Sequence, residues 1–168
     1  MYTGIASANT LIQKCENYTG SMKNEALGTA HFIRGFNYFK LLRQYGGVPL
    51  KLEPSTTVEL EFSRASAQDV IEQILSDLLE AYAKLPSSES MEGKLTKSAA
   101  AHFLAKAYLW RASEINDGWN SGTKNTDLDN VIKYASEVIA AHPLADNYRD
   151  LWAYTEPDGA NEKLPEIV

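Results

Sequence analysis

Apolar residues recur at helical spacing in five stretches of the chain, and polar segments with glycine or proline separate these stretches. The third stretch gives the clearest pattern, because its apolar residues, three and four positions apart, form one stripe along a helix. The stripe consists of Val70, Ile71, Ile74, Leu75, Leu78, Leu79 and Tyr82. Ser66 and Asp69, just before it, have the spacing of a capping box. Strand-like alternation is never sustained over more than a few residues, so the sequence predicts an all-α fold.

The same periodicity places the other helices. We predict helices over residues 3–17, 25–45, 66–84 and 96–114, with a fifth that begins at Asp127 and ends before Pro143. Gly46 and Gly47 follow the second helix, where glycine commonly ends a helix in a left-handed conformation. Residues 51–64 lack a helical period and are expected to be extended. Tyr148, Leu151 and Trp152 are consistent with a sixth helix that begins within 146–154.

The predicted helices come in pairs that resemble the tetratricopeptide repeat, a hairpin of two helices. First-helix spacing is matched by Leu75, Leu78, Leu79 and Tyr82, and second-helix spacing by Gly28, Phe32 and Gly35 and by Ala100, Leu104 and Ala107. Two features depart from the repeat: Leu79 stands where a small residue is usual, and the linker before Ala100 is longer than usual. We expect a tetratricopeptide-like stack of hairpins, 3–17/25–45 beside 66–84/96–114. A closed antiparallel helix bundle is the alternative, because amphipathic helices alone give many of these matches.

Length and charge restrict the function. The chain has 168 residues, which suits one domain, and a net charge of −6, which argues against a nucleic-acid partner. No apolar run approaches the roughly 18 residues that a membrane-spanning segment needs, and the start of the chain does not resemble a signal peptide. The single cysteine, Cys15, allows no internal disulfide and no cysteine-based metal site.

Four blocks of sequence resemble the SusD/RagB family, the nutrient-binding outer-membrane lipoproteins of gut-type Bacteroidetes. The first block is RGFNYFKLLRQYGGVPL at residues 34–50, which is similar to the family's long helix followed by a glycine turn and Val-Pro-Leu. The second runs from SRAS at 63–66 to the Leu-Pro at 85–86, and the third is the alanine-rich stretch 93–109. The last is PEIV at 165–168. Their order and spacing agree with the family.

The resemblance implies that residues 1–168 form a single helical-repeat domain, a fragment of a longer protein without the signal peptide, the lipid anchor and the C-terminal part. Cys15 lies within a helical stripe and so does not match the lipid-bearing cysteine. By the resemblance, the parent lies on the cell surface at the outer membrane, captures oligosaccharides and docks on a SusC-like TonB-dependent transporter. The chain by itself is expected to be soluble. A generic tetratricopeptide adaptor that binds a peptide partner is the alternative.

The sequence offers no catalytic residues. It lacks the nucleophile elbow of serine hydrolases, the zinc-binding helix motif and the phosphate-binding glycine loop. Glu72, Asp77 and Glu80 are expected on a solvated face opposite the apolar stripe. The three histidines, His31, His102 and His142, lack metal-ligand spacing. We therefore expect no enzyme activity, no metal and no cofactor.

The most suggestive stretch is the polar segment 114–127. Trp119 stands close to Asp117 and Asn120, and an exposed indole with carboxylate and amide neighbours suits a sugar, which presents an apolar face and a ring of hydroxyls. We therefore take these three residues as candidate glycan-binding residues. The competing interpretation, which we favour, is that Trp119 packs back to anchor the segment, whereas Trp110 and Trp152 are expected in the core.

Calcium is a weaker possibility for the same segment. Asp117, Asn125, Asp127 and Asp129 supply oxygen atoms, but their spacing is not that of an EF-hand loop.

Overall fold

The computed structural model describes residues 1–55, 57, 61–88 and 93–143. These residues form five α-helices, one short 3-10 helix and no strand, which confirms the all-α prediction. The helices are α1 (Tyr2–Glu16), α2 (Lys23–Tyr45), α3 (Ala67–Lys84), α4 (Lys97–Arg111) and α5 (Lys124–Ala141), and the 3-10 helix is η1 (Glu114–Asn116).

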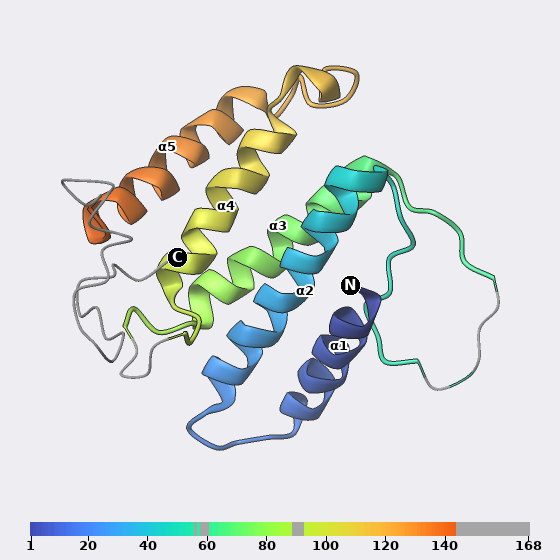
Figure 1. Cartoon of the computed structure of the whole chain (residues 1–168), viewed down its shortest axis with the longest axis vertical. Coiled ribbons are helices and arrows are strands. Elements are labelled where there is room, and N and C mark those ends of the chain that lie inside the picture. Colours follow the sequence, from blue (N-terminus) through green and yellow to red (C-terminus); the bar gives the residue numbers. More distant parts are fainter. Residues whose placement is uncertain (56, 58–60, 89–92, 144–168) are drawn as a thin grey trace, which may run out of the picture.

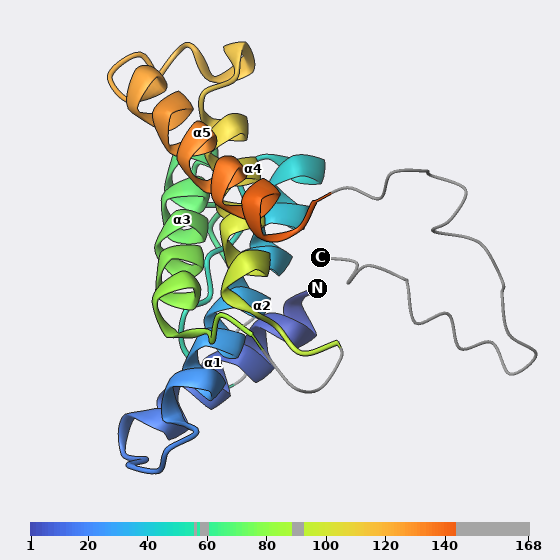
Figure 2. The same ribbon diagram turned by 90° about the vertical axis from the view of Figure 1, so that its left-hand side faces the viewer.

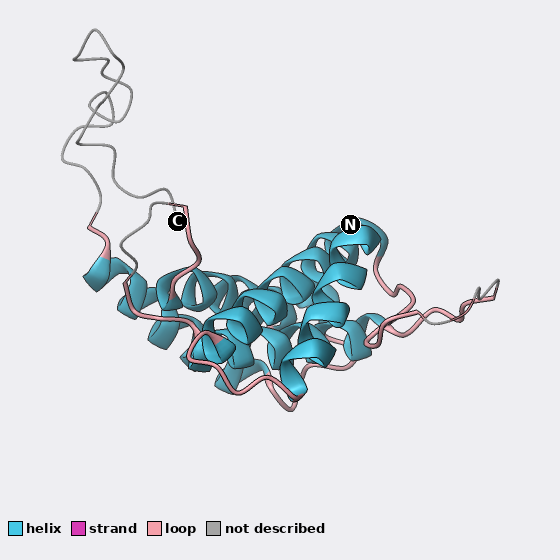
Figure 3. Ribbon diagram, turned by 90° about the horizontal axis from the view of Figure 1, so that it is seen from below, coloured by secondary structure: helices cyan, strands magenta, loops and turns pink. Residues whose placement is uncertain are grey.

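Each helix packs chiefly on the next one along the chain (Figure 1). The pairs α1–α2 and α3–α4 form the two predicted hairpins, and α2 packs on α3 to join them. Within the part of the chain that the structure describes, α1 has no extensive packing with α4 or α5, as a closed bundle would require. Seen from below, the helices form a curved, open array (Figure 3). The prediction of a hairpin stack is therefore confirmed.

Helix α3 lies at the centre of this array, between α2 and α4 (Figures 1 and 2). Its stripe is almost wholly buried, and Val70, Ile71, Ile74 and Leu78 have no exposed surface. Leu79 lies at the edge and is 39% exposed. The predicted capping box is present, because the Asp69 backbone N–H donates to Ser66 Oγ (3.0 Å) and the Ser66 N–H donates to the Asp69 carboxylate (3.2 Å).

Small residues set the close approach of α2 to α3. A Cβ atom at Gly35 would lie 3.2 Å from Asp77 Cβ and 3.3 Å from Leu78 Cγ, and one at Gly28 would lie 2.9 Å from Leu85 Cγ. Larger side chains at these positions would push the helices apart. The small positions of the repeat pattern therefore serve packing. Gly46 ends α2 with φ of +67°, a sign that glycine adopts readily, but its ψ of −130° differs from the left-handed helical cap that the sequence suggested.

Two predicted boundaries were wrong by about one turn. Helix α4 ends at Arg111, and η1 follows it, because a run of turns replaces the helical hydrogen bonds after Ala112. Helix α5 begins at Lys124, three residues before Asp127, since the Asp127 N–H already donates to the Thr123 carbonyl (2.8 Å). The described part of segment 51–64 contains neither helix nor strand. The predicted sixth helix, Trp152 and residues 165–168 lie outside the described residues.

Candidate functional site

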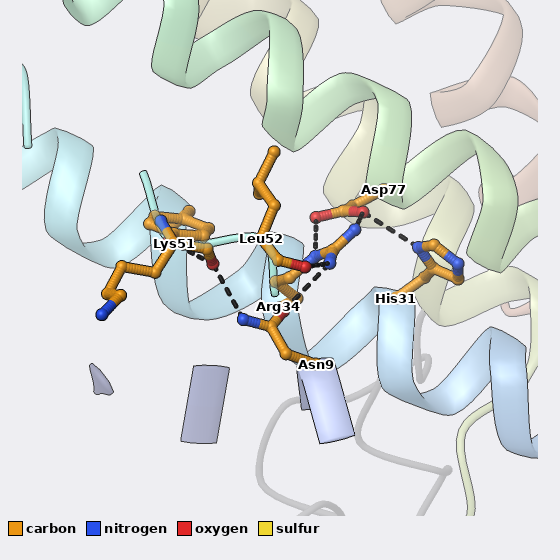
Figure 4. A network of polar contacts seen from close by, with 7 residues as sticks. Asn9, His31, Arg34, Lys51, Leu52 and Asp77 are labelled. Atoms are coloured by element: carbon orange, nitrogen blue, oxygen red, sulfur yellow. Dashed lines mark hydrogen bonds and ion pairs between the residues drawn. The ribbon is translucent and has the colours of Figure 1, made fainter. Parts of the chain in front are cut away.

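A buried arginine on α2 links three helices (Figure 4). The Arg34 Nε donates to Asp77 Oδ2 (2.9 Å) and its Nη2 donates to Asp77 Oδ1 (2.7 Å), which joins α2 to α3 through a bidentate pair. The Arg34 Nη1 donates to Asn9 Oδ1 on α1 (2.9 Å) and to the Leu52 carbonyl (3.1 Å). Four hydrogen bonds therefore satisfy a guanidinium that is almost fully buried.

The same network holds the segment that follows α2. The Asn9 side-chain amide donates to the carbonyls of Lys51 (2.9 Å) and Glu53 (3.1 Å). The Tyr38 hydroxyl donates to the Lys51 carbonyl (2.9 Å) and accepts from the Lys51 N–H (2.6 Å). Burial raises the pKa of Tyr38 to about 12, so this hydroxyl keeps its proton at neutral pH. These contacts are structural, because the polar atoms of Asn9 and Tyr38 are already used.

Asp77 corrects the sequence analysis. It was expected on the solvated face but is 1% exposed. Helical spacing places it between Ile74 and Ala81, on the side of α3 that faces α2. Burial alone would raise the pKa of Asp77, but the hydrogen bonds with His31 and Arg34 and the positive charge of Arg34 outweigh burial and lower that pKa. Glu72 and Glu80 are exposed, as expected.

His31, which has no carboxylate at metal-ligand spacing in the sequence, has a carboxylate partner in the structure. Its Nδ1 lies 2.9 Å from Asp77 Oδ1, across 46 residues of sequence. Spacing within one helix could not reveal this partner. The sequence did contain one sign that a buried acidic partner was needed, namely the position of Arg34. Arg34 stands four residues from both Ala30 and Tyr38, which are fully buried on the same side of α2.

The structure separates the three glycan candidates of segment 114–127. Asp117 is exposed and pairs with Lys124 (2.8 Å). Trp119 is half-buried and packs on the core, with its ring centroid 6.4 Å from that of Trp110, which is also half-buried. Asn120 is buried and its amide nitrogen donates to the carbonyls of Arg111 (2.7 Å) and Ser113 (3.0 Å). Asn120 therefore holds the segment onto the end of α4.

A second buried arginine explains the place of Asp127. The Arg111 Nε and Nη2 donate to the two carboxylate oxygens of Asp127 (2.9 and 2.6 Å), and Nη1 donates to Glu72 Oε1 (2.7 Å). Burial would lower the pKa of Arg111, but the hydrogen bonds and charge of Asp127, with the charge of Glu72, raise it. Asp127 is thus occupied by Arg111 and does not supply a free oxygen pair to a calcium ion.

Among the described residues, no three histidine, cysteine or acidic side chains lie together as metal ligands. None of the described helices combines the length and the apolar character that crossing a membrane requires.

One small hollow lies between α1 and the segment after α2. It has a volume of about 170 Å³ and is lined by Tyr2, Ile5, Ala6, Asn9, Lys51, Glu53 and Ser55. The Tyr2 hydroxyl donates to the Pro49 carbonyl (2.9 Å), and Lys51 Nζ donates to Ser55 Oγ (3.0 Å). The Asn9 amide is already bonded to the backbone of the same segment. The hollow therefore offers few free polar groups to a ligand.

Several known proteins are similar in sequence to this chain. Residues 1–109 match the family model described as "Starch-binding associating with outer membrane". A SusD-like protein of Bacteroides ovatus is 34% identical over 163 residues, which cover 91% of this chain and 29% of the relative. SusD-like protein P38 of Formosa agariphila is 30% identical over 175 residues, which cover 99% of this chain and 32% of the relative. The chain therefore spans about a third of the length of these curated relatives.

Solved structures share the fold. A crystal structure with xylogluco-oligosaccharide matches 98% of this chain and 33% of its own, with a TM-score of 0.78 and 31% identity. A laminarin-binding SusD-like protein matches 92% of this chain and 33% of its own, with a TM-score of 0.75 and 26% identity. The family match, over residues 1–109, covers well over half of the chain. The chain belongs to the SusD-like family.

Proposed function

We propose that this chain is the helical-repeat part of a surface protein that captures glycans at the outer membrane and docks on a SusC-like TonB-dependent transporter for oligosaccharide uptake. The observation that carries the proposal is the match of 98% of the chain to a crystal structure with xylogluco-oligosaccharide. The protein acts by binding, without catalysis. This function is favoured over a generic peptide adaptor because the matching relatives are SusD-like proteins along most of the chain.

Within that function, the chain serves mainly as a scaffold for docking. A sugar site needs several convergent aromatic and polar groups. In the described residues, the polar groups around Arg34 bond to one another, and Asn120 is buried with its amide nitrogen bonded to backbone carbonyls. Asp117 and the exposed part of Trp119 remain as the sugar-facing candidates. We therefore expect the chain to bind the transporter more readily than it binds sugar.

Isothermal titration of the chain with xylogluco-oligosaccharide and with laminarin oligosaccharides tests the sugar arm. One stacked indole and one carboxylate should give a Kd on the order of millimolar. Trp119→Ala should abolish that weak binding, and Tyr45→Ala, which removes an exposed aromatic far along α2, should leave it unchanged. Binding at low micromolar Kd would contradict the scaffold role. Weak binding that survived Trp119→Ala would exclude segment 114–127 as the sugar-binding region.

The docking part of the proposal is tested in a separate binding measurement. The chain is immobilised on a surface, and its binding of a purified SusC-like transporter in detergent is measured. We expect saturable binding with a Kd at least tenfold below that for any oligosaccharide, and no effect of Trp119→Ala. Failure of the transporter to bind, together with tight binding of an unrelated extended peptide, would favour the adaptor alternative.

A further inference from the structure

Helices α2 and α4 meet through three phenylalanine rings. The centroids of Phe36 on α2 and Phe103 on α4 lie 5.0 Å apart, edge to face, and the Phe32 ring lies 6.1 Å from the first and 5.5 Å from the second. Phe32 is buried, whereas Phe36 and Phe103 are only partly buried where they pack on the core. Two rings of this contact therefore keep part of their surface open to solvent.

A lysine ammonium lies over each of these two rings. Lys40 Nζ is 4.6 Å from the centroid of Phe36, one turn earlier on α2, and Lys106 Nζ is 5.3 Å from that of Phe103 on α4. Both lysines are exposed, and neither has a carboxylate partner in the part of the chain that the structure describes. A cation over an exposed ring is held only weakly, so both charges remain available to an external anion.

Apolar side chains extend this surface along both helices. Ile33, three residues before Phe36, is 37% exposed, and Leu109, three residues after Lys106, is 53% exposed. Residues three and four apart lie on one side of a helix, so each of these side chains continues the row of its own helix. We call the surface formed by Ile33, Phe36, Lys40, Phe103, Lys106 and Leu109 the α2–α4 face.

The charge of α2 and α4 is opposite to that of the whole chain. The net charge of the chain is −6, yet α4 has no acidic residue and α2 has only Glu25. Glu25 lies in the first turn of α2 and pairs with Lys94 (2.8 Å), whereas Lys40 lies close to the last turn. Burial and the positive charge of Lys106 lower the pKa of His102, so this imidazole is neutral at pH 7. The charged side chains of the α2–α4 face are therefore both positive.

We propose that the transporter docks on the α2–α4 face through a segment that carries carboxylates beside a large apolar side chain. This inference rests on the proposed function, which supplies the partner, and it adds the face and the chemistry of the contact. The carboxylates pair with Lys40 and Lys106, and the apolar side chain covers Leu109 and the open parts of the two rings. A positive face on an acidic chain also orients the chain during approach, because the net charge of the chain repels an acidic partner elsewhere.

A protein segment fits this face better than a small ligand does. A small ligand needs a concave site that buries most of its surface. The hollow described above is lined by α1 and residues 51–55, and no residue of the α2–α4 face contributes to it. The two lysines project from different helices, so an extended partner surface reaches both of them at once.

Charge reversal in the transporter-binding measurement tests the proposal. Lys40→Glu with Lys106→Glu should raise the Kd for the transporter about tenfold or more, because the carboxylates of the partner then meet like charges. Lys84→Glu with Lys133→Glu makes the same change of net charge on α3 and α5 and is the matched control, which should leave the Kd nearly unchanged. High salt should weaken binding of the unmodified chain far more than that of the Lys40 and Lys106 variant. Circular dichroism checks that all variants keep their helices.

The apolar part of the contact is tested in the same measurement. Leu109→Ser should raise the Kd for the transporter about threefold or more, because the partner then loses apolar cover. Ile115→Ser, at an isoleucine that is 78% exposed outside α2 and α4, is the control and should have no effect. Isothermal titration with oligogalacturonate, an anionic sugar, should show no binding that depends on the two lysines.

The outcomes separate this inference from the proposed function. A transporter that binds the unmodified chain and the Lys40 and Lys106 variant equally would overturn the inference and leave the docking function intact. Failure of the unmodified chain to bind the transporter would overturn both. Binding of oligogalacturonate that the lysine substitutions abolish would overturn the inference as well, because an anionic sugar would then occupy the α2–α4 face.

Discussion

Two buried arginine–aspartate pairs join consecutive helices, α2 to α3 and α4 to α5, at different positions along those helices. Arg34 lies in the middle of α2 and meets Asp77 in the middle of α3. Arg111 is the last residue of α4 and meets Asp127 in the first turn of α5. Both pairs are bidentate, a geometry that lysine cannot reproduce. The Arg34–Asp77 pair therefore holds α2 and α3 together at their middles. The Arg111–Asp127 pair holds the end of α4 to the start of α5.

The surroundings of the two pairs also differ. Asp77 accepts from Arg34 and contacts His31, while Arg34 also donates to Asn9 and the Leu52 carbonyl, so the pair lies within a network from α1 to α3. Arg111 has one further charged partner, Glu72, whose side chain is half-exposed. Loss of Asp77 would leave a buried cation without any counter-charge. Loss of Asp127 would leave Arg111 with Glu72. The first junction should therefore depend more on its aspartate than the second.

The largest expected effect is that of Asp77→Asn. It leaves Arg34 charged and buried, and removal of one partner of a buried pair costs roughly 3–5 kcal/mol. Urea unfolding followed by circular dichroism measures the change. Glu80→Gln, at an exposed carboxylate on the same helix, is the control and should change stability little. A loss below about 1 kcal/mol for Asp77→Asn would mean that water reaches Arg34.

Truncation of Leu78 tests the apolar part of the same junction. Leu78 has no exposed surface and lies against Gly35, so Leu78→Ala should leave a cavity and cost roughly 2–5 kcal/mol. Leu79→Ala removes the same atoms from the adjacent, partly exposed position and should cost clearly less. Equal losses at the two positions, or a loss under about 0.5 kcal/mol at Leu78, would show that the register of α3 is wrong.

The difference between apolar and ionic contacts explains what the sequence could predict. The stripe of α3, its capping box and the hairpin pairing follow from local spacing, and the structure confirms them. The Arg34–Asp77 pair spans 43 residues, so no local pattern contains it. The sequence feature that indicates the pair is the position of Asp77, at helical spacing from the buried residues Ile74 and Ala81. A pattern built from apolar residues alone leaves Asp77 out.

The candidate site was less predictable than the fold. Composition drew attention to segment 114–127, but composition does not show which way each side chain points. The Asn120 amide turns inward because it bonds to the carbonyls of Arg111 and Ser113. Trp119 packs near Trp110, nine residues earlier. The glycan-binding role of Asp117, Trp119 and Asn120 stays a prediction.

Asp127→Asn should be milder than Asp77→Asn. Arg111 keeps its ion pair with Glu72 (2.7 Å), so the loss should be nearer the roughly 1–3 kcal/mol of a buried group that loses one hydrogen-bonding partner. The same urea titration measures it. The double variant Glu72→Gln and Asp127→Asn should cost more than the sum of the two single changes, because only then is Arg111 left uncompensated. Additive losses would show that Glu72 does not substitute for Asp127.

Acid should weaken the first junction through Asp77. Because the folded state lowers the pKa of this carboxyl, its ionisation stabilises the fold fully above about pH 5 and progressively less as pH falls through about 4 toward the lowered value. The free energy of unfolding, measured at pH 7, 5, 4 and 3, should therefore fall more steeply for the unmodified chain than for Asp77→Asn. Parallel curves would mean that Asp77 has the same pKa in the folded and unfolded chain.

The smallest expected effect is that of Glu72→Gln alone. The Glu72 side chain is half-exposed, and exposed ion pairs contribute about 0.2–1 kcal/mol because water and side-chain entropy offset the attraction. Salt provides the sharper test, since about 1 M NaCl screens exposed charges within roughly 3 Å. High salt should remove most of the difference between Glu72→Gln and the unmodified chain, yet leave the loss in Asp77→Asn nearly intact. If salt reduced the losses of stability in both variants equally, Arg34 and Arg111 would be equally accessible to solvent. The two junctions would then differ only in the geometry of their contacts.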